Sequence, residues 1–376
     1  MTANDRARSR KPRRPAKPFR PRAAKARRRA LRARLAPVDL VGLLVTKPVN
    51  VRYLTGFAGS YGALLLLHDR TVFFTDRRYE RQAAEVDGAE VVIAPGDLIA
   101  GVIGVLGTDG DGLGFEPGGL TWGTGQRLRT LLPGRAVVPA PELVEELREV
   151  KDDDELAAMR EAARIATETL PEVLGGLRAG VTEREVALEI ELGMRRLGGN
   201  GLAFDPIVAF GEHAAEPHHR PGERALGRGE LVTLDFGALV EGYRSDMTRT
   251  VVFGTASPRQ REVYELVRHA EETGLAALRP GVSCAEVDQA CRRVIADAGW
   301  GDAFGHPSGH GVGLEIHEAP WVRPGGSGRI AAGTPVTVEP GVYLPGFGGV
   351  RIEDLAVVRP DGHELLTTAP RELLEL

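Results

Sequence analysis

The sequence predicts an α+β protein of two domains, in which an α/β domain precedes a duplicated domain of helices and antiparallel strands. Its 376 residues exceed what one hydrophobic core usually supports. Short apolar runs alternate with turns from about residue 36 to residue 141, as in an α/β domain. Beyond residue 145, one helix pattern and one strand pattern each occur twice, which indicates an internal duplication. The composition, 42% hydrophobic and 27% charged, is typical of a globular chain.

The first 35 residues form a basic segment that differs from the rest of the chain. They contain 15 Lys and Arg and one acidic residue, so the net charge of −4 conceals an acidic remainder with 33 basic and 51 acidic residues. Because this segment has almost nothing apolar to bury, we expect residues 1–35 to be a disordered tail, at least as far as Ala23. A solvated extension is the favoured interpretation, and contact with nucleic acid is the alternative.

The α/β domain is expected to span residues 36–145. Its strand-like runs are 42–45, 63–67, 71–75, 91–94 and 136–138, and a helix is expected over 76–86. Residues 142–169 are highly charged, with apolar residues at three-to-four spacing, which predicts two helices, the second beginning at Asp152–Asp154. We interpret these charges as a solvated face and place the second domain at residues 146–376.

The second domain contains an internal repeat. The segment LRAGVTEREV at 177–186 matches LRPGVSCAEV at 278–287. In each copy a hydroxyl residue, Thr182 or Ser283, is followed three positions later by a glutamate. This spacing predicts a capping box, so an amphipathic helix is expected to begin in each copy. Cys284 and Cys291 then lie seven residues apart in one helix, about 10 Å along its axis, which is beyond disulfide reach; we expect both to be buried.

A strand pattern is also duplicated, and each copy carries acidic residues. LVTLDFG at 231–237 resembles PVTVEPG at 335–341, and strand alternation places Asp235 and Glu339 on the polar faces. A second acid lies beyond a turn in each half, Asp246 in the first and Glu353 in the second. If each half forms an antiparallel hairpin, the four carboxylates meet at a pseudo-twofold axis.

Four carboxylates held together need positive charge, because they repel and raise one another's pKa values. Two divalent cations supply that charge. Oxygen ligands favour ions such as Mn²⁺, and a single imidazole also admits Co²⁺, Zn²⁺ or Fe²⁺. The alternative is that the acids cap strands or pair with nearby arginines, namely Arg244, Arg249 and Arg351.

A histidine-rich segment, FGHPSGHGVGLEIHE at 304–318, favours the metal interpretation. It contains three of the nine histidines of the chain. His310 and His317 offer one metal ligand and one proton donor. Glycines at 309, 311 and 313 are expected to let the backbone approach a ligand closely.

These motifs resemble those of the pita-bread metallopeptidases, a family that includes methionine aminopeptidase, Xaa-Pro aminopeptidase and Xaa-Pro dipeptidase (prolidase). The matching segments are LDFGALVEGYRSDMTRT (234–250), GHGVGLEIHEAP (309–320) and VTVEPGVYLPGFGGVRIED (336–354). VNVRYLTGFAGSYGALLL (49–66) and FFTDRRYERQA (73–83) are similar to the creatinase-type N-terminal domain, which methionine aminopeptidases lack. The resemblance therefore implies a creatinase-like α/β domain followed by a pita-bread catalytic domain, and it indicates the proline-specific branch.

The resemblance also implies a site that holds two divalent ions, most simply Mn²⁺. The five implied ligands are Asp235, Asp246, His310, Glu339 and Glu353. Asp246 and Glu353 would bridge the ions, Asp235 would bind one, and His310 with Glu339 would complete the other. A hydroxide shared by the ions would attack the scissile carbonyl, while Glu339 transfers a proton to the leaving amine.

Further site residues follow from the same resemblance. His317 would stabilise the oxyanion, and His218 would lie near the scissile carbonyl and the proline. His306 and Arg351 would contact the substrate or orient other groups. His219 departs from the small residue that is common in the family. Aromatic residues that line the pocket or pack in the core are Phe204, Phe210 and Tyr243, with core packing favoured.

The implied function is that of an Xaa-Pro aminopeptidase, which removes one N-terminal residue from a small peptide whose second residue is proline. The near alternative is an Xaa-Pro dipeptidase with the same site. An alternative of another class is a metal-free creatinase-like hydrolase or a peptide-binding pseudoenzyme, which five intact ligands disfavour. No apolar run approaches the roughly 18 residues of a membrane span, and none is typical of a signal peptide. We therefore expect a cytoplasmic protein without membrane contact, and from the resemblance a homodimer.

Overall fold

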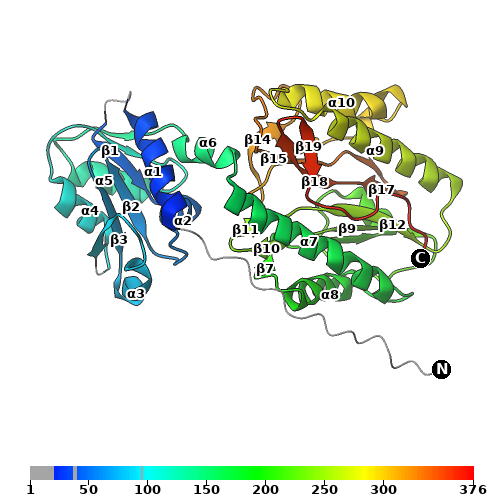
Figure 1. The fold of residues 1–376 in the computed structure, drawn as a ribbon. Coiled ribbons are helices and arrows are strands. Elements are labelled where there is room, and N and C mark those ends of the chain that lie inside the picture. Colours follow the sequence, from blue (N-terminus) through cyan, green and yellow to red (C-terminus); the bar gives the residue numbers. More distant parts are fainter. Residues whose placement is uncertain (1–20, 37–39, 95) are drawn as a thin grey trace.

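The computed structural model describes residues 21–36, 40–94 and 96–376. Figure 1 shows a smaller N-terminal domain and a larger C-terminal domain, with helix α6 (Leu143–Glu149) between them. No helix in the described ranges combines the length and the apolarity needed to cross a lipid bilayer.

The N-terminal domain is built on a mixed six-stranded sheet with the order β4-β3-β2-β1-β5-β6. The strands are β1 (Gly42–Val45), β2 (Ala63–Leu67), β3 (Thr71–Thr75), β4 (Glu90–Ile93), β5 (Leu113–Phe115) and β6 (Val137–Pro139). Strands β1, β2 and β3 are antiparallel neighbours, whereas β4, β5 and β6 join in parallel. The helices are α2 (Pro48–Thr55), α3 (Glu80–Ala83), α4 (Leu98–Leu106) and α5 (Trp122–Leu131). The five strands expected from sequence are thus present to within one residue.

Helix α1 (Pro21–Leu35) corrects the prediction of a disordered tail over residues 1–35. Leu31 and Leu35 are buried in the core of the N-terminal domain. The guanidinium group of Arg28 is also buried, and it donates a 2.6 Å hydrogen bond to the carbonyl oxygen of Leu54. The tail prediction failed because it counted charges and overlooked two leucines that lie four residues apart on one helix face. The remainder of the predicted tail, residues 1–20, lies outside the described residues.

The C-terminal domain contains the predicted duplication. Two helices precede each strand pair: α7 (Asp153–Gly176) and α8 (Glu183–Arg196) in the first half, α9 (Pro258–Ala277) and α10 (Cys284–Asp297) in the second. Both predicted capping boxes are present, because the hydroxyls of Thr182 and Ser283 accept hydrogen bonds from backbone N–H groups three residues later. Asp152 caps α7 in the same way. Cys284 and Cys291 are free and buried, as expected.

Each half contributes an antiparallel strand pair that is connected by a shorter hairpin. In the first half β9 (Glu230–Asp235) pairs with β12 (Thr248–Phe253), and β10 (Ala238–Val240) with β11 (Tyr243–Arg244) lies between them. In the second half β15 (Pro335–Val338) pairs with β18 (Asp354–Arg359), and β16 (Gly341–Leu344) with β17 (Gly348–Arg351) lies between them. The remaining strands are β7 (Gly201–Leu202), β8 (Ile207–Phe210), β13 (Gly309–Gly311), β14 (Glu318–Val322) and β19 (Gly362–Leu365).

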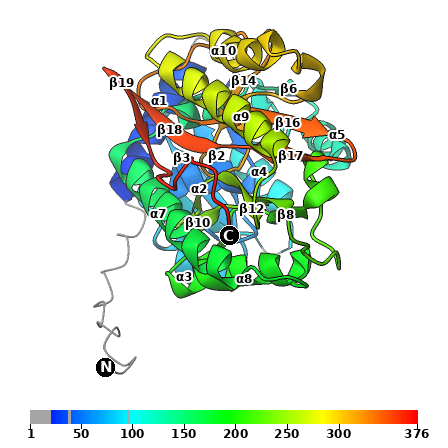
Figure 2. The same ribbon diagram turned by 90° about the vertical axis from the view of Figure 1, so that its right-hand side faces the viewer.

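The strand layer lies between the helices of the two halves. In Figure 1, α9 and α10 lie above the strands and α7 and α8 lie below them, and Figure 2 shows the same order from the side. Each helix pair covers its own apolar core, one that includes Phe210 and Phe236 and one that includes Cys291 and Val338. The polar ends of the central strands therefore lie between two rigid apolar layers.

The assignment of α1 to the N-terminal domain predicts a stability effect. Leu31→Ala should reduce the free energy of unfolding by about 2–5 kcal/mol, because it removes a fully buried side chain and leaves a cavity. Urea denaturation followed by circular dichroism measures the change. Arg29→Ala, at an exposed position of the same helix, is the matched control. Equal midpoints for both variants would contradict the packing of α1.

Candidate metal centre

The four predicted acidic residues lie at the ends of the paired central strands. Asp235 is the last residue of β9, and Asp246 precedes β12 by two residues. In the second half Glu339 follows the last residue of β15, and Glu353 immediately precedes β18. The two halves thus place one acid at the end of the first strand and one before the last strand. This arrangement is the pseudo-twofold convergence that the sequence predicts.

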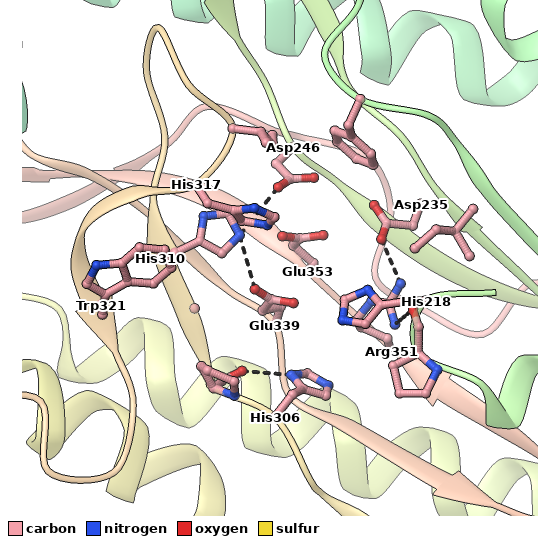
Figure 3. Close-up of a pocket in the computed structure, with 16 residues that line it drawn as sticks. His218, Asp235, Asp246, His306, His310, His317, Trp321, Glu339, Arg351 and Glu353 are labelled. Atoms are coloured by element: carbon pink, nitrogen blue, oxygen red, sulfur yellow. Dashed lines mark hydrogen bonds and ion pairs between the residues drawn. The ribbon is translucent and has the colours of Figure 1, made fainter. Parts of the chain in front are cut away.

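The donor atoms of Asp246, His310, Glu339 and Glu353 gather at one buried point (Figure 3). The Nε2 atom of His310 lies 3.3 Å from Oε1 of Glu339 and 3.6 Å from Oδ2 of Asp246. Ligand atoms of Asp246, His310 and Glu353 all lie within 4.8 Å of one another. Asp235 faces the same cavity, where Nη2 of Arg351 is 2.6 Å from its Oδ2.

The unsatisfied oxygens of this cluster fit cation binding. Oδ1 of Asp235 and Oδ1 of Asp246 are buried without a hydrogen-bond partner among the described residues. A buried polar atom in that state costs about 1–3 kcal/mol, and more when it is charged. His310 has a suitable orientation, because its Nδ1 lies 3.0 Å from the carbonyl oxygen of Gly311 and leaves Nε2 to face the carboxylates.

The pKa values of the cluster also indicate that it lacks positive charge. Burial and the neighbouring carboxylates raise the pKa values of Asp246 and Glu353 well above the ordinary range. Burial raises the pKa of Glu339 to about 7, although Arg351 opposes the shift. Burial also lowers the pKa of His310 to about 3, so its imidazole is neutral, as a metal ligand must be. The set therefore fits one or more divalent cations, which would replace the protons on these carboxylates.

A cavity of about 290 Å³ adjoins the cluster. All four predicted residues that are not ligands, His218, His306, His317 and Arg351, line it. Its apolar wall comprises Phe204, Ile207, Pro217, Pro307, Ile316 and Trp321. The sequence analysis did not identify Trp321, which is 41% exposed, as a residue of the cavity wall. Its position four residues after His317 could have indicated that it lies near the site.

Tyr343 is a second residue that the sequence interpretation missed. Arg351 is fully buried and donates from Nη1 to the hydroxyl of Tyr343 at 2.8 Å. That hydroxyl is also 2.8 Å from Nε2 of His306. Burial lowers the pKa of His306 to about 4, so the ring is neutral and accepts from Tyr343. One hydrogen-bonded chain therefore fixes His306, Tyr343, Arg351 and Asp235 relative to one another.

The glycines around His310 serve strand packing. A Cβ atom on Gly309 would overlap the carbonyl oxygen of Thr337, and one on Gly311 would overlap the carbonyl oxygen of Ala319. Gly309 also lines the cavity, and the expectation that these glycines let the backbone approach a ligand stays a prediction. The same two glycines allow β13 to approach its neighbours closely enough to place His310 beside the acids.

The remaining aromatic and arginine residues named in the sequence analysis lie partly where they were expected. Phe204 lines the cavity, whereas Phe210 is in the core. Tyr243 is buried and donates a 2.6 Å hydrogen bond to Glu155. Of the arginines considered as structural partners for the acids, Arg351 pairs with Asp235.

Two family models cover most of this chain. Residues 27–150 match the creatinase/prolidase N-terminal domain, and residues 157–360 match metallopeptidase family M24. The chain belongs to metallopeptidase family M24, and it is a hydrolase with a creatinase-type N-terminal domain and a pita-bread domain. The first match begins within α1, in agreement with the packing of that helix.

Individual relatives are similar over nearly their whole length. The uncharacterized peptidase YqhT of Bacillus subtilis is 40% identical over 348 residues, which is 92% of this chain and 99% of that protein. The Xaa-Pro dipeptidase of Pyrococcus furiosus is 34% identical, covering 88% and 94%. Among solved structures, the Xaa-Pro dipeptidase from Bacillus anthracis has a TM-score of 0.91 at 39% identity, covering 94% and 100%. The X-Pro aminopeptidase from Thermotoga maritima has a TM-score of 0.85 at 31% identity, covering 93% and 99%.

The raised pKa of Glu339 predicts a pH dependence of metal affinity. A cation must displace the protons held by Glu339, whose pKa is about 7, and by Asp246 and Glu353, whose pKa values are also raised, so Mn²⁺ affinity should rise with pH, by about tenfold or more per pH unit below pH 7. In the metal-free chain, the protonated carboxyl of Glu339 makes its full contribution to the free energy of unfolding below pH 4.5, the ordinary pKa of Glu. This contribution is lost as the pH rises through about 7. Calorimetric titration with Mn²⁺ at pH 6 and pH 8 tests the prediction. Equal affinities at both pH values would contradict it.

Proposed function

We propose that this chain is an Xaa-Pro dipeptidase, which hydrolyses the bond between a first residue and a following proline. The observation that carries the proposal is the convergence of four carboxylates and His310 beside a cavity lined by three further histidines. Two relatives named Xaa-Pro dipeptidase, at 34% and 39% identity, support it.

The proposal includes two divalent ions, most simply Mn²⁺. Asp235, Asp246, His310, Glu339 and Glu353 would hold the ions, and Asp246 and Glu353, which precede β12 and β18, would be the ligands common to both, as the family resemblance implies. Asp235 is assigned to one ion, and His310 with Glu339 to the other. The imidazole also makes Co²⁺, Zn²⁺ and Fe²⁺ chemically suitable. When bound, such a pair of ions activates water and polarises a substrate carbonyl.

Glu339 is assigned the proton transfer. It is half-buried at the cavity, and its Oε1 faces both the hydroxyl of Thr337 and Nε2 of His310, each at 3.3 Å. A carboxylate at this position can accept a proton from water and return it to a leaving amine. We assign it to accept the proton of the attacking water and to deliver it to the leaving nitrogen of proline.

His317 is assigned to stabilise the oxyanion. Burial and the neighbouring His218 lower the pKa of its ring, so it donates a hydrogen bond as a neutral imidazole. Its ring lies edge-on to that of His310, with centroids 4.4 Å apart. His218 is assigned to the scissile carbonyl and the proline, whereas His306 and Arg351 position the neighbouring groups through Tyr343.

The substrate chemistry suits the cavity wall. An Xaa-Pro bond is a tertiary amide without an N–H group, so the site needs no acceptor for that donor. Phe204, Ile207 and Trp321 provide an apolar surface on which we place the pyrrolidine ring.

Xaa-Pro aminopeptidase is the second candidate, and the sequence interpretation favoured it. The similarity to the X-Pro aminopeptidase from Thermotoga maritima, at 31% identity, supports this candidate. The two activities use the same proposed centre and differ in whether a residue beyond proline is accepted. Homodimer formation stays a prediction.

The substrate range tests the proposal directly. The full chain loaded with Mn²⁺ should hydrolyse Ala-Pro, leave Ala-Pro-Ala and the control Ala-Ala intact, and lose its activity when a chelator removes the metal. Liquid chromatography of the products measures each reaction. Comparable hydrolysis of Ala-Pro-Ala would favour the aminopeptidase instead. Failure to cleave either proline peptide, or full activity after chelation, would contradict both candidates.

His317→Ala tests the oxyanion assignment. Removal of this donor should reduce kcat by about 10²–10³, with little change in KM and with unchanged metal content. His269→Ala is the matched control, because His269 is exposed on α9 outside the cavity lining. A variant with normal kcat, or one that loses its metal, would contradict the assigned role.

A further inference from the structure

A second cluster of metal-ligating side chains lies outside the cavity lining. It consists of Glu183, His213 and His219, whose ligand atoms all lie within 4.8 Å of one another. Nδ1 of His213 is 2.9 Å from Oε1 of Glu183, and Nε2 of His219 is 2.9 Å from Oε2. The two rings lie side by side, with centroids 4.3 Å apart. Both imidazoles therefore present a nitrogen to the same carboxylate.

Glu183 is held rigidly at the first turn of α8. Its side chain is fully buried, and its two oxygens accept backbone hydrogen bonds from Phe210 at 3.0 Å and Gly222 at 3.1 Å. Burial opposes its ionisation, but hydrogen bonds from His219, the two backbone amides and His213 keep the pKa of this carboxyl below its ordinary value. The carboxylate is thus charged and fixed, and one lone pair on each oxygen faces an imidazole.

His219 lies between two carboxylates. Its Nδ1 is 3.1 Å from Oε2 of Glu216, while its Nε2 faces Glu183. A ring with one N–H donates to only one of the two carboxylates, so its other nitrogen needs a second proton or a metal cation. A cation bound at Nε2 would satisfy this geometry, because the ring would then donate its remaining N–H to Glu216. A histidine ligand with a carboxylate on its other nitrogen is the common arrangement at zinc sites.

We propose that Glu183, His213 and His219 form a third metal site, separate from the dinuclear centre, and that it takes Zn²⁺. Two imidazoles and one carboxylate are a recurrent zinc ligand set, with water in the fourth position. His213 is 32% exposed and His219 is 10% exposed, so the fourth position has access to solvent. The main centre, with four carboxylates and one imidazole, is a harder ligand set and suits Mn²⁺.

The site would fix a loop that reaches the substrate cavity. The chain from Gly211 to Gly222 contains both histidines of the cluster, and between them lie Pro217 and His218, which line the cavity. The carbonyl oxygen of Pro217 also accepts a hydrogen bond from Nη1 of Arg351 at 3.3 Å. A bound ion would hold this loop against α8, and so would hold His218 in place.

Metal content of the full chain tests the site. After chelation, equilibration with Zn²⁺ and removal of free metal, the wild-type chain should retain about three zinc ions. His213→Ala and His219→Ala should each lose about one ion and retain the other two, whereas the control His269→Ala should keep all three. Mass spectrometry of the metals gives the count. Equal zinc content in the wild type and both variants would overturn the proposal.

Anomalous scattering at the zinc edge locates the ions independently of the variants. Crystals of the wild-type chain grown with Zn²⁺ should show a peak among Glu183, His213 and His219. Absence of that peak would overturn the third site, even when a variant fails to fold. Peaks beside Asp246 and Glu353 report on the dinuclear centre alone, so the two proposals fail separately.

Discussion

The mutual repulsion of buried carboxylates is the constraint around which this molecule is arranged. Backbone pairing of β9 with β12 and of β15 with β18 brings the acidic ends of four strands together. The apolar layers above and below prevent the strands from separating to relieve the repulsion. Protons or cations must therefore neutralise the cluster. Because the pKa of Glu339 is raised to about 7, this carboxyl exchanges its proton near neutral pH when no metal is bound.

The loop that carries His317 depends on the linker and on the N-terminal domain. Glu315 and Glu318 flank His317, and both pair with Arg148 of α6. Glu315 also pairs with Lys47 at 2.9 Å. Arg148 lies in the charged stretch that the sequence interpretation took for a solvated face, yet its side chain is only 3% exposed. The half-buried pair Lys47–Glu315 and the buried pair Arg148–Glu318 therefore join the N-terminal domain and α6 to the loop that carries His317, and loss of the buried pair would leave a charge unpaired in the interior.

The duplicated features were predictable from sequence because each has a short local pattern. A hydroxyl residue three positions before a glutamate defines the start of α8 and of α10, and alternation places Asp235 and Glu339 on polar faces. Features that depend on distant contacts were missed. Nothing in the sequence next to Tyr343 indicates that its hydroxyl joins His306 to Arg351. Strand β5 was not predicted either, because its three residues are too few to show an alternating pattern. The Glu183 cluster was missed for the same reason, because its members are up to 36 residues apart.

The duplication is imperfect at one position, and this would make the two proposed metal positions unequal. Strands β8 and β13 occupy equivalent places, since each pairs antiparallel with the first strand of its hairpin, β9 or β15. Phe210 opposes Val232 in the first half, and Gly311 opposes Val336 in the second. The glycines allow β13 to bring His310 to the carboxylates, whereas β8 is apolar at the corresponding residues. One half thus supplies oxygen ligands alone and the other adds an imidazole, so two ions bound here would differ in ligand field and in their hold on a shared water.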